Sequence, residues 1–142
     1  MILNCAIIDE DPEALALLKH YVEETPSLNL IGAYHNAIEA VDGIHHSHLD
    51  ILFLAIHMQQ ISGLEFAKLV PMNVKIIFTT AFKEYAIEAY KVNAFDYLVK
   101  PILYEDFMQT CQKVFDHYMQ DDAYNPIKRD GFVVVKNESK YT

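Results

Sequence analysis

The amino-acid sequence predicts an α/β fold in which a doubly wound, five-stranded parallel sheet carries helices on both faces. Short apolar runs alternate along the chain with longer segments whose apolar residues recur at helical spacing. The central runs are apolar throughout, which is typical of parallel strands buried on both faces. The length of 142 residues is sufficient for one such domain and its core without disulfides or metal.

Five strands and five helices are expected in alternation. The apolar runs predict strands over Ile2–Ile8, Leu28–Ala33, Asp50–Ile56, Val74–Thr79 and Phe95–Val99. Helix starts are indicated by a proline in the first turn and by capping side chains. The predicted helices begin near Pro12, Asn36, Ser62, Lys83 and Leu103, and the last one ends at Met119.

Composition narrows the class of protein. With 52% hydrophobic residues, 22% charged residues and 4 glycines, the chain is globular, and disordered, collagen-like and disulfide-rich classes are excluded. A formal charge of −9 argues against binding of nucleic acid by this chain alone.

The longest apolar runs are strand-sized and no leader pattern opens the chain, so we expect a cytoplasmic protein. Cys5 and Cys111 lie in apolar patterns and are expected to be buried thiols rather than a disulfide or zinc ligands.

The chain is expected to divide near residue 120. Residues 121–142 hold as many basic as acidic residues, so residues 1–120 carry the negative charge. Asp121, Asp122, Asn125 and Pro126 predict a linker over residues 121–130. Residues 131–142 then begin a new strand, which is too short to form a domain and indicates the start of a truncated one.

Polar residues gather where the predicted strands end, and ligands of open parallel sheets bind at that edge. Asp9, Glu10 and Asp11 follow the first strand. Such carboxylates suit magnesium, although Asp11 and Glu10 would also favour the positive end of the next helix. Lys100 precedes Pro101 after the fifth strand and is therefore extended, which directs its ammonium at a phosphate or at Asp9 and Glu10. No glycine-rich phosphate loop follows a strand, so dinucleotide and P-loop sites are excluded.

The order of these residues resembles a known family. Asp9 and Glu10, Thr80, and Lys100 with Pro101, together with Met58, Ser62 and Gly63, resemble the receiver domain of bacterial two-component response regulators over residues 1–120. The stretches 77–81, 84–89 and 93–101 resemble receivers joined to a LytTR-type DNA-binding domain, and residues 131–142 resemble the first strand of that domain. The resemblance implies a flavodoxin-like fold with strand order 2-1-3-4-5 and a cis bond before Pro101.

Three residues depart from the family pattern. Ala55 stands where receivers carry the aspartate that accepts a phosphoryl group from a histidine kinase, and Gln59 stands where they usually carry proline. Glu10 replaces the more common aspartate of the metal site. A methyl group cannot form an acylphosphate, so we expect no phosphorylation at the usual position. Magnesium is expected to bind weakly or not at all, which leaves Lys100 to neutralise the acidic pair.

The resemblance also assigns a switch and an interface. Thr80 and Tyr97 match residues that move together when a receiver is phosphorylated, here without their trigger, and Lys100 completes the phosphate site. Tyr85, Tyr90 and Tyr97 match the face through which relatives dimerise, although a well-packed helix would explain them as well. The partners implied are a second copy of the chain, a sensor histidine kinase, and DNA through the C-terminal domain only.

These features predict a receiver-like signalling module, not an enzyme, that controls a LytTR domain in transcription and is not phosphorylated at Ala55. One alternative is an ordinary phosphorylatable receiver in which Ala55 was engineered, but a single engineered change would not explain Gln59. A second alternative is a binder of a small ligand on a flavodoxin-like sheet, since the fold alone does not fix function.

Overall fold

The structure is a computed structural model that describes residues 1–45 and 48–124. The chain divides into two units between Phe107 and Met108. The strand expected within residues 131–142, and most of the expected linker, lie outside the described residues.

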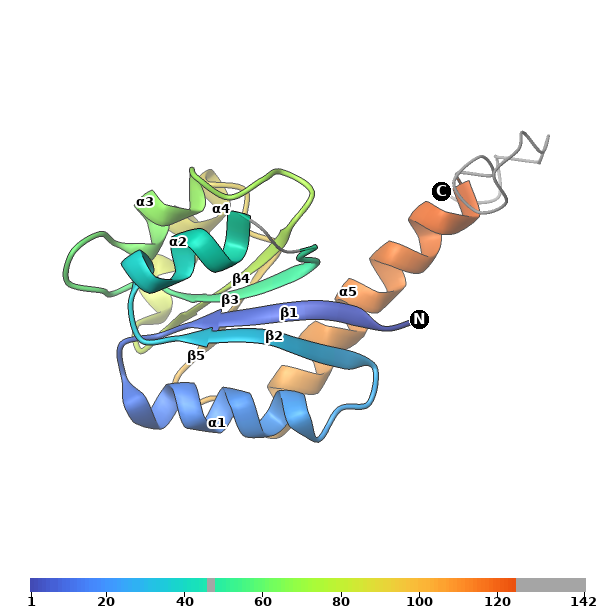
Figure 1. Cartoon of the computed structure of the whole chain (residues 1–142), viewed down its shortest axis with the longest axis horizontal. Coiled ribbons are helices and arrows are strands. Elements are labelled where there is room, and N and C mark those ends of the chain that lie inside the picture. The colour runs from blue at the N-terminus through green and yellow to red at the C-terminus, as the bar shows by residue number, and fades with distance from the viewer. Residues whose placement is uncertain (46–47, 125–142) are drawn as a thin grey trace. The chain divides into compact units, whose positions relative to one another are not determined.

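The first unit contains a single five-stranded parallel sheet (Figure 1). Its strand order, β2-β1-β3-β4-β5, confirms the predicted doubly wound topology. The strands are β1 (Leu3–Ile8), β2 (Leu28–Tyr34), β3 (Ile51–Ala55), β4 (Lys75–Thr80) and β5 (Asp96–Val99). All five residues of β3 are buried, as its uninterrupted apolar sequence predicts for a central strand.

Helices cover both faces of this sheet (Figure 1). One face carries α1 (Pro12–Glu23), and the other carries α2 (Ala37–His45), α3 (Gly63–Ala67) and α4 (Ala86–Lys91). The predicted helix from Lys83 is divided, because a 3-10 turn, η1 (Lys83–Tyr85), precedes α4.

Side-chain caps fix where these helices begin. The Asp11 carboxylate accepts a hydrogen bond from the backbone N–H of Glu13 at 3.1 Å, and the Ser62 hydroxyl accepts one from Glu65 at 3.1 Å. Each cap satisfies a backbone donor that has no partner within the helix. The first cap therefore fixes the chain directly after β1, and the second fixes it after β3.

The last helix, α5 (Tyr104–Tyr124), is longer than the sequence indicated. Asp121 and Asp122 were expected to open a linker, but the helix passes through them to Tyr124. Aspartate is tolerated in helices, whereas the residue before a proline is disfavoured in the α conformation, so Pro126 is the stronger stop signal. Among the described residues, no helix is long and apolar enough to cross a membrane.

Aromatic packing on the α1 face ties the first turn of α5 to the sheet. The rings of Phe53 and Phe107 stack with centroids 5.5 Å apart, and Tyr21 of α1 lies 5.3 Å from Phe107. The Tyr21 hydroxyl donates to the carbonyl of Ile102 at 2.9 Å. These contacts hold the segment that follows Lys100 and Pro101 against the sheet.

Both cysteines are buried, as their apolar sequence patterns predicted. Cys5 and Cys111 are free and buried. Burial, with a smaller contribution from the Asp50 carboxylate, raises the pKa of the Cys5 thiol to about 12. The Cys5 side chain therefore stays protonated and unreactive at neutral pH.

Candidate functional site

Strand register brings the polar residues together at the carboxyl edge of the sheet. Ile8 pairs with Leu54, so the next residues, Asp9 and Ala55, come level with each other. Ala55 in turn pairs with Thr79. Because side chains level with one another on parallel strands point to the same face, Asp9, Ala55 and Thr79 form one row across three strands.

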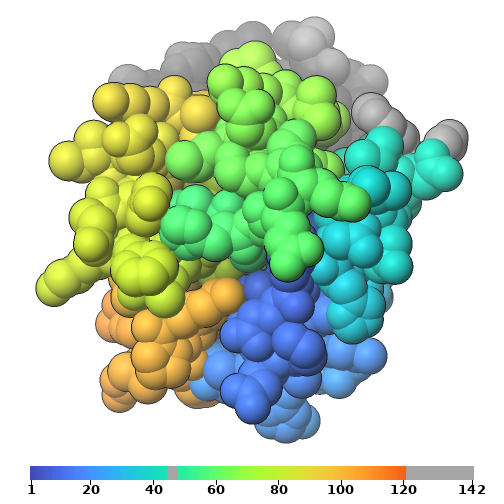
Figure 2. Space-filling model, turned by 90° about the vertical axis from the view of Figure 1, so that its left-hand side faces the viewer, coloured from blue at the N-terminus to red at the C-terminus, as the bar shows by residue number. Residues whose placement is uncertain are grey.

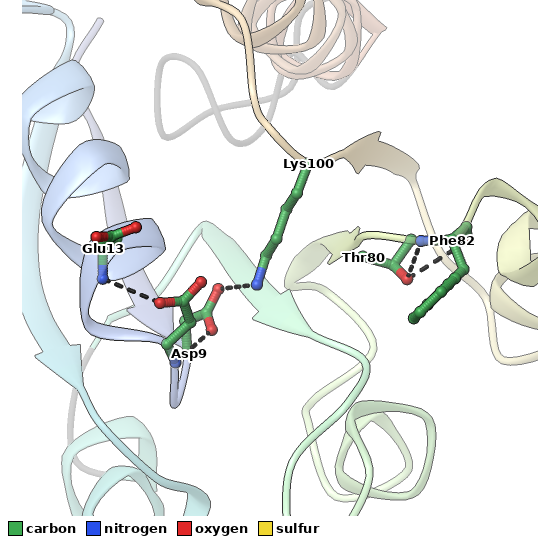
Figure 3. A network of polar contacts seen from close by, with 6 residues as sticks. Asp9, Glu13, Thr80, Phe82 and Lys100 are labelled. Atoms are coloured by element: carbon green, nitrogen blue, oxygen red, sulfur yellow. Dashed lines mark hydrogen bonds and ion pairs between the residues drawn. The ribbon is translucent and has the colours of Figure 1, made fainter.

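Asp9 and Lys100 form the charged centre of this edge. The Lys100 ammonium lies 2.8 Å from one carboxylate oxygen of Asp9, and the Asp9 side chain is only 2% exposed. The other oxygen accepts a hydrogen bond from the backbone N–H of Asp11 at 2.9 Å. Figure 3 shows the lysine reaching from the end of β5 to Asp9. The Lys100–Pro101 peptide bond is cis.

Ala55 ends β3 beneath a tight connection to α3. The Gly63 N–H donates to the Ile56 carbonyl at 2.7 Å. A Cβ at Gly63 would lie 2.0 Å from the Ala55 carbonyl oxygen, so this close approach requires glycine. Ala55 is 1% exposed, and its methyl group lies in the row with Asp9 and Thr79.

Gln59 provides a contact that the sequence did not reveal. Its backbone N–H donates to a carboxylate oxygen of Glu10 at 2.9 Å. Proline, the residue that the resemblance to receivers implies at this position, has no N–H and could not form this bond. Gln59 therefore gives Glu10 a partner within the chain.

These contacts leave a poor donor set for magnesium. Asp9 is paired with Lys100, while Ala55 contributes no oxygen. Within the part of the chain that the structure describes, no three His, Cys, Asp or Glu side chains form a metal-binding group. Since magnesium requires oxygen ligands in near-ideal octahedral geometry, the residues present do not fit it.

Thr80 is placed at the edge but turned toward the β4–α4 connection. Its hydroxyl accepts a hydrogen bond from the Phe82 N–H at 3.0 Å and lies 3.4 Å from the Phe82 carbonyl (Figure 3). Thr79, its neighbour, is 1% exposed. Of the buried side-chain oxygens that the structure describes, that of Thr79 lacks any hydrogen-bond partner.

The three tyrosines predicted to share an interface lie in two different settings. Tyr90 is 55% exposed and packs edge-on against half-buried Tyr97, with centroids 6.3 Å apart. Tyr85 instead packs against His57, with centroids 4.8 Å apart, and against Phe82 at 6.3 Å. Tyr90 and Tyr97 thus belong to the α4–β5 surface, whereas Tyr85 belongs to the connections that follow β3 and β4.

The fold and this edge define a flavodoxin-like α/β domain whose polar groups gather beside the end of β3. The chain belongs to the response regulator receiver domain family, whose family model matches residues 5–112. It is 39% identical over 102 residues to the transcriptional regulatory protein BtsR of Escherichia coli K12, a match covering 70% of this chain and 43% of that protein. An uncharacterized response regulatory protein of Vibrio cholerae is 34% identical over 127 residues, covering 88% of this chain and 53% of the relative.

Solved structures agree with the fold. The response regulatory domain of protein mrkE from Klebsiella pneumoniae superposes with a TM-score of 0.75 at 24% identity, covering 83% of this chain and 99% of that one. The response regulator protein TrrA of Thermotoga maritima, in complex with Mg(2+)-BeF, superposes with a TM-score of 0.70 at 27% identity. The match covers 80% of this chain and 99% of that one. The chain spans about half the length of the curated relatives it matches.

Proposed function

We propose that this chain is a receiver module of a two-component response regulator that does not take a phosphoryl group at position 55. The observation that carries this function is Ala55, a buried methyl group in the row between Asp9 and Thr79. Acylphosphate formation needs a carboxylate nucleophile. Gln59 favours a site that natively lacks phosphorylation over one engineered at Ala55, because its N–H holds Glu10.

Groups within the chain take over the role of a bound metal, which would otherwise balance the negative charge of Asp9 and Glu10. The Lys100 ammonium neutralises Asp9, and the backbone N–H of Gln59 donates to Glu10. We therefore expect millimolar magnesium to leave the thermal midpoint nearly unchanged, because stabilisation by a ligand appears only above its dissociation constant.

The output is proposed to be control of transcription in the cytoplasm. BtsR, which is 39% identical to this chain over 102 residues, is a transcriptional regulatory protein. The match covers 43% of BtsR, so that protein contains a further part of similar length. We propose that the remaining part of this regulator is a LytTR DNA-binding domain that follows residue 130. The receiver then acts as a regulatory partner of that domain and of a sensor histidine kinase, and it carries out no catalysis of its own.

Dimerisation through the α4–β5 surface is proposed as the means of control. Tyr90 and Ile87 are 55% and 69% exposed there, and exposed apolar side chains in one patch are typical of an interface. Sedimentation of the chain and of its Tyr90→Ala variant tests this: a dimer that the substitution weakens is expected, and an unmodified chain that stays monomeric would contradict it.

Treatment with acetyl phosphate and magnesium tests the proposed function. A gel that retards phosphoproteins should show a single, unshifted band for this chain, while a receiver with an intact aspartate, run beside it, should shift. An acid-labile phosphoryl group on the unmodified chain would refute the assignment.

A further inference from the structure

A cavity opens at the carboxyl edge beside the site, between the connections that follow β1, β3 and β4. Its volume is about 500 Å³, and it is a shallow depression that is largely open to solvent. The residues that line it are Glu10, Ile56, His57, Met58, Gln59, Ser62, Leu64 and Tyr85. In Figure 2 the blue β1–α1 segment and the green β3–α3 segment meet on this face. In strand order 2-1-3-4-5, the switch point where doubly wound sheets bind ligands lies between β1 and β3.

The walls of the cavity suit a planar ring. Met58 and Leu64 contribute apolar surface, and Tyr85 contributes an aromatic ring. The His57 imidazole stands edge-on to Tyr85 at 4.8 Å and to Phe82 at 5.3 Å, so the β3–α3 and β4–α4 loops meet at these rings. A ring held by both loops costs little entropy when a ligand packs on it.

The polar groups of the cavity favour a positive charge on the ligand. Glu10 is the one carboxylate that lines it, and no lysine or arginine contributes to the described walls. One Glu10 oxygen accepts the Gln59 N–H, but a carboxylate has about four acceptor positions, so it can also accept from a ligand. An ammonium or amidinium group is the natural partner because charge-assisted hydrogen bonds are the stronger ones.

We propose that this cavity binds a small organic cation with a planar ring, the ring against Tyr85 and the positive group at Glu10. The site stands whether or not position 55 can be phosphorylated, because no lining contact involves Ala55. Ligand binding would bridge the two loops that flank the edge, the β3–α3 connection that carries Met58 and the β4–α4 connection that ends in Tyr85.

The binding site is tested with tryptamine, an indole with a cationic side chain, titrated into the isotope-labelled chain and followed by backbone amide shifts. Saturable shifts are expected at Glu10, Met58, Gln59 and Tyr85. Indole-3-acetate, which carries the same ring with a negative charge, should bind at least about tenfold more weakly. Absent shifts, or equal affinity for the two probes, would overturn the assignment.

Matched variants separate the two halves of the site. Glu10→Gln should weaken tryptamine binding about tenfold, whereas Glu13→Gln, which alters a carboxylate outside the cavity, should leave it unchanged. Tyr85→Phe keeps the ring and should keep binding, and Tyr85→Ala should lose it. Equal binding by Glu10→Gln and the native chain, or by Tyr85→Ala and Tyr85→Phe, would place the probe elsewhere and refute the site.

Discussion

The two sides of the carboxyl edge have departed from the family pattern to different extents. On the β1–β5 side, Asp9 and Lys100 are both present and lie 2.8 Å apart. On the β3 side, the proposed function places Ala55 where receivers carry their phosphoacceptor carboxylate and Gln59 where they usually carry proline. In that proposal the charged residues of the site are present while its nucleophile is not. We expect Asp9 and Lys100 to stabilise the edge, because each satisfies the other's charge.

The largest effect on stability is expected when the ion pair between Asp9 and Lys100 is broken. Lys100→Met leaves the 2%-exposed Asp9 carboxylate without its counter-charge, which should lower the free energy of unfolding by about 3 kcal/mol. Urea denaturation measures it. The double variant Asp9→Asn with Lys100→Met should recover much of the loss, since no uncompensated charge remains. A Lys100→Met chain as stable as the native one would show that the pair is not structural.

The connection that follows β3 is expected to be rigid where Gly63 approaches the Ala55 carbonyl oxygen. Gly63→Ala would place a Cβ 2.0 Å from the Ala55 carbonyl oxygen, and neither backbone can move without disturbing the sheet. We expect a loss of about 2 kcal/mol, the cost of overpacking, in the same denaturation assay. Gly43→Ala is the matched control, because the atoms it meets belong to the side chain of Tyr34, which can move. If the two variants cost the same, the close approach at Ala55 has no special rigidity.

Two adjacent threonines give the smallest and most selective test. Thr80→Val removes a hydroxyl that accepts from Phe82 at 3.0 Å, and it should cost about 1 kcal/mol. Thr79→Val removes a buried hydroxyl that has no partner, and it should be neutral or stabilising. Thermal unfolding of both variants compares their stabilities. A larger loss for Thr79→Val than for Thr80→Val would mean that the Thr79 hydroxyl, rather than that of Thr80, forms the stabilising hydrogen bond.

The sequence predicted most of the fold for a physical reason. Alternating apolar runs determine which segments are strands and helices, and these elements match the structure to within a few residues, as Ile51–Ala55 shows. The pairing of Lys100 with Asp9 also followed, because the carboxyl ends of parallel strands meet at one edge.

Contacts that depend on backbone groups could not be predicted. The Gln59–Glu10 bond uses an amide that every residue except proline has, so no side-chain pattern marks it. The separation of Tyr85 from Tyr90 depends on the 3-10 turn before α4, which helical periodicity does not reveal. The length of α5 was underestimated because Asp121 and Asp122 resemble a turn in composition, whereas the helix continues to Tyr124.

The most direct test of the central claim restores the missing side. In the double variant Ala55→Asp with Gln59→Pro, a carboxylate returns to the row between Asp9 and Thr79, and Glu10 is released from the amide of residue 59. Intact mass spectrometry after treatment with acetyl phosphate and magnesium should find one phosphoryl group on the restored chain and none on the native chain. A phosphoryl group on the native chain, or none on the restored one, would contradict the assignment of the defect to position 55.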